Sequence, residues 1–165
     1  MDYNNYKKYI TEKFSKHFTI SHQYRLQNLT FDFAAIYNER NIRYFASKKI
    51  ELDAIENNEF CFFTYIPNLL PQDFILLSTT LESSVTTLVQ PTPEHMSTYI
   101  TCIIITEKLE NYELISQLKN YKYSKSFLFN LKGWAKIRFI IVDLVFDKIY
   151  SCKEGDSVKM IYDYT

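Results

Sequence analysis

An almost unbroken apolar run from Tyr99 to Thr106 constrains the fold of this chain more than any other feature. Both parities of the run are apolar, with Ile100, Cys102, Ile103, Ile104 and Ile105. An extended segment with apolar side chains on both faces is typical of a strand that is covered on both sides. We therefore expect this segment to be a central strand of a sheet.

Three segments have apolar residues at spacings of three and four, which predict amphipathic helices. They are residues 2–18 with Asp2 as N-cap, residues 74–88 ending before Pro91, and residues 111–121 with Asn111 as cap. Alternating or apolar runs predict strands at residues 29–37, 42–56, 60–66, 127–131, 134–145, 148–152 and 158–162, with turns at 38–41 and a hairpin at 57–58. This order predicts one α+β domain over residues 1–165: a mixed, largely antiparallel sheet with an N-terminal helix and two further helices packed on it.

The chain has two glycines, Gly133 and Gly155, and their separation excludes both common phosphate-loop patterns. Those loops need closely spaced glycines, because backbone amides must approach phosphate oxygens without a Cβ in the way. The motifs GxSxG, HExxH and CxxC are also missing from the sequence. We expect no cofactor and no metal site.

Cysteine usage and hydropathy favour a cytoplasmic protein. The three cysteines are an odd number, and Cys61 and Cys102 lie in apolar runs, where a free thiol behaves as a small hydrophobe. The longest apolar runs are four or five residues, far below the roughly 20 that span a bilayer. The first residues do not have the pattern of an export signal, and no membrane association is expected.

The formal net charge is zero, but the charges are unevenly placed. Residues 1–49 have nine Lys and Arg against four acids, and residues 50–114 have one Lys against ten acids. The acidic segment lies between two basic ones, residues 1–49 and 115–165, which could attract an anion if they meet in space. Residues 121–127 interleave rings with amines, as a single-strand nucleic-acid surface does, yet the pI near 6.8 gives nucleic acid little support as a partner.

Two regions supply the candidate binding residues. Asn38, Glu39 and Arg40, together with Lys48, could bind a phosphate or a carboxylate near one end of the sheet. The alternative is a hairpin turn with charged tips, which has the same kind of sequence. His95 lies in a proline-rich loop before the central strand and could act as a base or ligand, and Trp134 could form part of a binding surface. For both, a structural role in the core is the alternative.

An enzymatic alternative is a metal-dependent hydrolase or nuclease acting on nucleic acid or a phosphorylated substrate. The order helix, three strands, helix, strand is similar to that of restriction-type nucleases, which need an acid on one strand and Asp/Glu-x-Lys on the next. Here Glu39, Arg40 and Lys48 would act with Glu51 or Asp53, but no Lys follows these acids at the required offset.

Several stretches resemble a family of short uncharacterised bacterial proteins, a domain of unknown function found mainly in clostridial-type Gram-positive bacteria. They are Tyr37–Asn41, Tyr44–Phe45, Ser47–Lys49, Pro93–Met96, Leu131–Trp134 and Val142–Leu144. The resemblance implies a cytoplasmic bacterial protein and no known activity, cofactor or catalytic residue.

These observations favour a binding or interaction module without catalysis. No catalytic constellation is visible in the sequence, whereas Tyr-rich strands could provide a partner surface or a small-ligand groove. The expected partner is a protein or a small ligand, and a homodimer is left open.

Overall fold

The computed structural model describes residues 1–44, 51–109 and 112–164, with side chains described for 1–41, 55–109 and 112–164. Its helices are α1 (Tyr3–Ser15), α2 (Pro71–Leu88) and α3 (Tyr112–Asn120), and two short 3₁₀ segments follow, η1 (Lys153–Gly155) and η2 (Lys159–Tyr162). Its strands are β1 (Thr19–Leu26), β2 (Leu29–Tyr44), β3 (Glu51–Tyr65), β4 (His95–Thr106), β5 (Tyr123–Ser126), β6 (Trp134–Asp143) and β7 (Lys148–Ser151).

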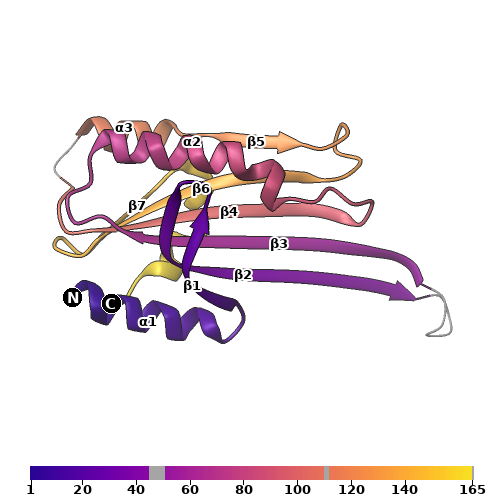
Figure 1. The fold of residues 1–165 in the computed structure, drawn as a ribbon, viewed down its shortest axis with the longest axis horizontal. Helices are drawn as coiled ribbons and strands as arrows, with labels where there is room; N and C mark the ends of the chain where they lie inside the picture. The colour runs from indigo at the N-terminus through magenta and orange to yellow at the C-terminus, as the bar shows by residue number, and fades with distance from the viewer. Residues whose placement is uncertain (45–50, 110–111, 165) are drawn as a thin grey trace.

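The described strands form one mixed sheet in the order β1-β2-β3-β4-β6-β5, with β7 also paired to β6 (Figure 1). β4 is parallel to its neighbours β3 and β6, whereas the other pairings are antiparallel. Every residue of β4 from Ile100 to Thr106 is buried. The predicted α+β class and the predicted central strand are both confirmed.

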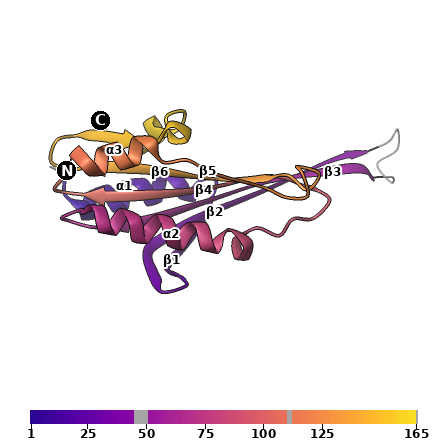
Figure 2. The ribbon, with the colours of Figure 1, turned by 90° about the horizontal axis from the view of Figure 1, so that it is seen from above.

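Helices cover both faces of the sheet, and each covered face has its own apolar core. Figure 2 shows α2 lying along one of these faces. On one face α1 contributes Tyr6, Ile10 and Phe14, which pack with Tyr162 of η2 and the strands beneath. On the other face the stripes of α2 and α3 pack on the remaining strand side chains. The two layers explain why the central strand is apolar at both parities.

Local capping sets the helix starts. The Asp2 carboxylate accepts a hydrogen bond from the Asn5 amide at 3.0 Å, which confirms the predicted N-cap of α1. Pro71 opens α2, and the Asp73 carboxylate accepts from the Leu70 amide at 3.0 Å. The Leu88 end of α2 and the extent of α3 agree with the predicted helices.

The β2–β3 hairpin differs from the prediction. Asn38–Asn41 form no turn and Asn57–Asn58 form no hairpin; instead they face each other in two long antiparallel strands, with Asn38 opposite Asn58 and Asn41 opposite Ile55. The strand expected at 42–56 is therefore divided between β2 and β3. Asparagine is common in turns, but cross-strand pairing between the described parts of β2 and β3 decided its conformation here.

Three other boundaries were wrong. β1 was not predicted, because its polar and apolar residues do not alternate cleanly; Gln23 lies at φ 51°, and the pairing to β2 skips it. Residues 128–130 were expected in a strand but all have positive φ, and the strand here is β5 instead. Val158–Tyr162 was expected as a strand, but residues 159–162 form the 3₁₀ segment η2, whose Tyr162 packs under α1.

Candidate functional site

The α1-side face of the sheet changes from apolar to polar along the strands, in register across four of them. Beneath α1, Phe33, Phe63, Ile103 and Ile140 lie side by side in one cross-strand row. The next row, Ala35–Cys61–Thr101–Arg138, is also buried and brings the first charge. The strands then continue past the end of α1 (Figure 1).

Beyond Arg138 lie two polar and aromatic rows, whose eight side chains we call the open face. One row is Tyr37–Glu59–Tyr99–Lys136, and the other is Glu39–Asn57–Ser97–Trp134. Each of the eight residues is partly exposed. Because neighbouring strands are about 4.8 Å apart and alternate residues share a face, side chains in adjacent columns lie within contact distance.

Arg138 anchors the open face at its boundary with the apolar core. It is 3% exposed, and its Nε donates to Thr101 Oγ1 at 3.1 Å while an Nη donates to Glu59 Oε1 at 2.5 Å. The guanidinium also lies 3.8 Å from the centroid of the Tyr99 ring. Ion pairing and cation–π contact thus fix both the charge and the ring in one arrangement.

Trp134 lies at the outer corner of the open face. Its ring meets Tyr99 edge to face, with centroids 5.1 Å apart, and Lys136 Nζ lies 5.3 Å above it. Lys136 in turn donates to both carboxylate oxygens of Glu154 in η1, at 3.1 and 3.2 Å. The amine is therefore held between an indole and a carboxylate.

Gly133 allows the chain to enter β6 at this corner. Its φ is +74°, and an added Cβ would lie 2.4 Å from the carbonyl oxygen of Met96. Only glycine combines this left-handed conformation with so close an approach to another strand. The start of β6, and with it Trp134, depends on that contact.

Cys61 lies on the buried side of the boundary and is a poor nucleophile. Its Sγ lies 3.8 Å from Tyr162 Oη and 3.7 Å from Glu59 Oε1. Burial, and then the negative charge of Glu59, raise the pKa of the Cys61 thiol well above its usual range. The neutral thiol packs as a small apolar group.

The residues singled out from the sequence do not form one cluster. Glu39 and Trp134 share the outer row of the open face, with Asn57 and Ser97 between them. Asn38 and Arg40 alternate with Glu39, so they project from the opposite face of β2. There the Arg40 guanidinium forms a two-bond ion pair with Glu94, at 2.8 and 2.9 Å.

His95 has a fully bonded ring inside the α2-side layer. It is 3% exposed, with Nδ1 2.7 Å from the Lys132 carbonyl and Nε2 2.8 Å from Thr98 Oγ1. Both nitrogens are thus engaged in joining β4 to the turn before β6. Lys48 lies outside the described residues.

The residues of the hydrolase alternative are described only in part. Glu51 and Asp53 belong to β3, but their side chains are outside the described set. Among the described residues, no group of three or more His, Cys, Asp or Glu side chains could hold a metal ion. Glu39 and Arg40 alternate along β2, so their side chains project from opposite faces of the sheet.

Sequence reasoning missed most of the open face and the buried Arg138 at its boundary. Glu59, Tyr99, Lys136 and Arg138 were not selected, although each interrupts a strand that is otherwise rich in apolar residues. A charge at a parity that is apolar further along the same strand is a usable signal, since Lys136 and Arg138 share their parity with Ile140 and Val142.

The comparisons identify a family and no characterised relative. A family model described as "Domain of unknown function (DUF8052)" matches residues 2–164. The searches of curated proteins and of solved structures give no match. Within the described residues, no helix has both the length and the apolar character needed to cross a membrane.

Proposed function

The chain belongs to the DUF8052 family, whose function is unassigned, and from this premise we propose that it is a non-catalytic binding module whose open face holds a polypeptide segment. The observation that carries the proposal is the pair of Tyr99 and Trp134 rings on the partly exposed sheet face, with the buried Arg138 guanidinium fixed against the Tyr99 ring. Trp, Tyr and Arg are the residue types that dominate the binding energy of protein interfaces.

Preorganisation supports this use of the two rings. Arg138 is bonded to Glu59 and Thr101, and its guanidinium lies against the Tyr99 ring. A partner therefore meets side chains that have already lost most of their conformational freedom, which lowers the entropic cost of binding.

The charges of the open face favour a polypeptide with a basic residue over a nucleic acid. Arg138 is paired with Glu59, and Lys136 is paired with Glu154. Glu39 has no ion-pair partner among the described side chains and stands in the same row as Trp134. Phosphates would find both cations occupied, whereas a Lys or Arg beside an apolar side chain would match Glu39 and Trp134.

The test is selection of peptides from a random phage-displayed library on the immobilised protein, followed by fluorescence anisotropy with labelled synthetic copies. We expect selected peptides that combine a basic residue with an apolar or aromatic one. Trp134→Ala should weaken their binding by about 2 kcal/mol, roughly 30-fold, as expected of an interface anchor. Glu39→Gln should weaken the basic peptides by a smaller factor.

Glu12→Gln is the matched control for the acid, because Glu12 is an exposed acid on α1. It should leave peptide affinity unchanged. The proposal is wrong if the selected peptides bind the Trp134→Ala protein as well as the wild type. It is also wrong if oligothymidylate binds at Trp134 and no peptide does, a result that intrinsic fluorescence can report because the chain has a single tryptophan.

The cellular setting belongs to the same proposal. We take residues 1–165 as one domain, supported by the family match over residues 2–164 and by the single sheet. A cytoplasmic bacterial protein is consistent with three free, buried cysteines.

A further inference from the structure

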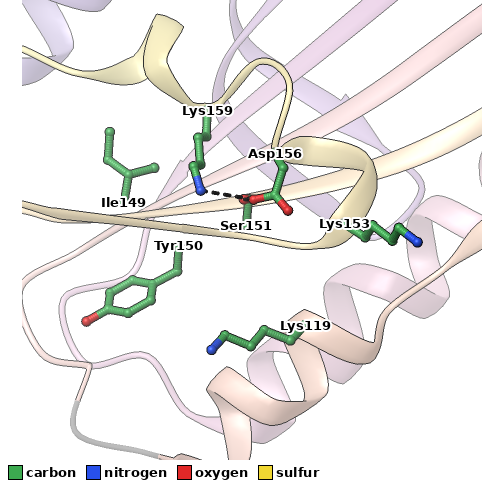
Figure 3. A pocket seen from close by; sticks show the side chains of 7 residues that line it. All are labelled: Lys119, Ile149, Tyr150, Ser151, Lys153, Asp156 and Lys159. Carbon is green, nitrogen blue, oxygen red and sulfur yellow. Dashed lines mark hydrogen bonds and ion pairs between the residues drawn. The ribbon is translucent and has the colours of Figure 1, made fainter.

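Two adjoining pockets lie at the other end of β6, where α3 packs near β7. One has a volume of about 250 Å³ and is lined by Lys119, Ile149, Tyr150, Ser151, Lys153, Asp156 and Lys159 (Figure 3). The second, of about 630 Å³, is lined by Leu109, Tyr112, Ile115, Lys119, Phe146, Lys148 and Tyr150. Lys119 and Tyr150 line both pockets, so the two pockets share a wall, and we call them together the groove.

The smaller pocket is cationic. In Figure 3 the ammonium groups of Lys119 and Lys159 lie on either side of the β7 strand end, whereas the Lys153 ammonium points outward. Lys159 is paired with Asp156 at 3.0 Å, but Lys119 and Lys153 have no ion-pair partner among the described residues. The pocket therefore keeps an excess of positive charge.

Asp156 offsets only one of the three lysine charges that line the smaller pocket. Its carboxylate accepts hydrogen bonds from Ser151 at 2.8 Å and from Lys159 at 3.0 Å. These bonds, with a further contribution from the Lys119 charge, hold the pKa of Asp156 below its ordinary value.

The larger pocket is apolar and aromatic. Leu109 and Ile115 contribute apolar surface, and Tyr112 and Phe146 stand at the surface, 91% and 55% exposed. Exposed rings beside an apolar pocket are suited to stacking on a flat heteroaromatic group. Lys148 adds another cation that has no ion-pair partner among the described residues.

We propose that this groove binds an aromatic organic phosphate of the nucleoside phosphate class, with the ring in the larger pocket and the phosphates beside Lys119, which lines both pockets. The two halves supply the two chemistries that such a ligand needs, a stacking surface and point charges for phosphate. The larger pocket lies in the usual size range of small-molecule sites. This site is separate from the open face, because it lies beside Ile140–Asp143 of β6 rather than Trp134–Arg138.

The test is isothermal titration calorimetry of the full chain with ADP, adenosine and pyrophosphate at equal ionic strength. ADP should bind at least about tenfold more tightly than adenosine or pyrophosphate, because only ADP occupies both halves. Lys119→Gln should weaken ADP about tenfold or more, since it removes a phosphate-facing charge from the shared wall. Lys122→Gln, at an exposed position outside both pockets, is the matched control and should leave ADP binding unchanged.

Each alternative result overturns a definite part of the proposal. Adenosine binding as tightly as ADP would show that the phosphates add no affinity. Pyrophosphate binding as tightly as ADP would show that the aromatic ring adds none. Equal ADP affinity in the wild type, Lys119→Gln and Phe146→Ala proteins would place any binding elsewhere. Thermal unfolding of each variant without ligand shows that it is folded. Because the open face plays no part in this experiment, its outcome is independent of peptide binding.

Discussion

Arg138 on β6 forms an ion pair with Glu59 on β3 across the intervening strand β4. The guanidinium passes Thr101, to which it donates, and lies against the Tyr99 ring on the way. The contact links the three parallel strands at the point where the apolar core under α1 ends. It therefore marks the end of that core and fixes Glu59 and Tyr99 of the open face in position.

Replacing Arg138 with Ala should therefore destabilise the fold. The change leaves Glu59 without its partner; because Glu59 is 29% exposed, water offsets part of the loss, and we expect about 1–3 kcal/mol. Urea unfolding measures the difference. Arg25→Ala is the control, an exposed arginine whose loss should cost no more than about 0.5 kcal/mol. Equal effects of the two substitutions would contradict a structural role for the ion pair.

The two glycines should differ sharply in their tolerance of alanine. Gly133→Ala forces a positive φ on a residue with a Cβ and brings that atom 2.4 Å from the Met96 carbonyl, so we expect a loss above about 2 kcal/mol. Gly155→Ala meets its nearest atom at 3.1 Å with no positive φ, and should cost less. Thermal and urea unfolding give the comparison. A Gly155→Ala protein that is less stable than the Gly133→Ala protein would contradict the expectation that Gly133 tolerates a Cβ less well.

The three thiols should be protected in the native protein. Cys61, Cys102 and Cys152 are buried, and burial raises the pKa of the Cys61 and Cys102 thiols well above the ordinary range. Because the thiolate is the reactive form, we expect little labelling by 5,5′-dithiobis(2-nitrobenzoic acid) until the protein unfolds. The same reaction in concentrated guanidinium chloride should label all three. Fast labelling of a folded sample would show that one of these sites opens.

The ion pair between Glu94 and Arg40 should stabilise the fold at neutral pH and lose this effect in acid. Its hydrogen bonds from Arg40 lower the pKa of the carboxyl from its ordinary value of 4.5. A group with a lowered pKa in the folded state stabilises the protein above its unfolded pKa, and that stability is lost as the pH falls through the folded value. The difference between the wild type and Glu94→Gln should thus be constant near neutral pH and shrink below about pH 4.5. A difference that does not change with pH would show that the ion pair is not its source.

Prediction from the sequence was accurate where one element could be read alone. The helical spacing of Phe74, Leu77 and Leu81 and the Asp2 cap gave helices close to α2 and α1. It failed at Asn38–Asn41, where a turn-forming composition was overridden by pairing with β3. Local propensity is a weak prior wherever a cross-strand partner supplies every backbone hydrogen bond.

The candidate site was predicted even less completely. Glu39 and Trp134 were selected separately, and nothing local indicated that Asn57 and Ser97 would lie between them in one row. Arg138 was overlooked because its partner Glu59 is 79 residues away in the chain. Its significance comes from that contact, not from its sequence neighbours.

The sequence by itself determined the α+β class, the doubly covered strand at the centre of the sheet and the helices that pack on it, because burial imposes a hydrophobic period that each segment carries alone. The tertiary structure decided the strand order, the register and the point at which α1 ends over the sheet. Those features arise from pairings between distant segments, and a register shift of one residue would move Arg138 and Trp134 to the opposite face. The open face and the lysine-lined groove therefore exist only in the folded chain.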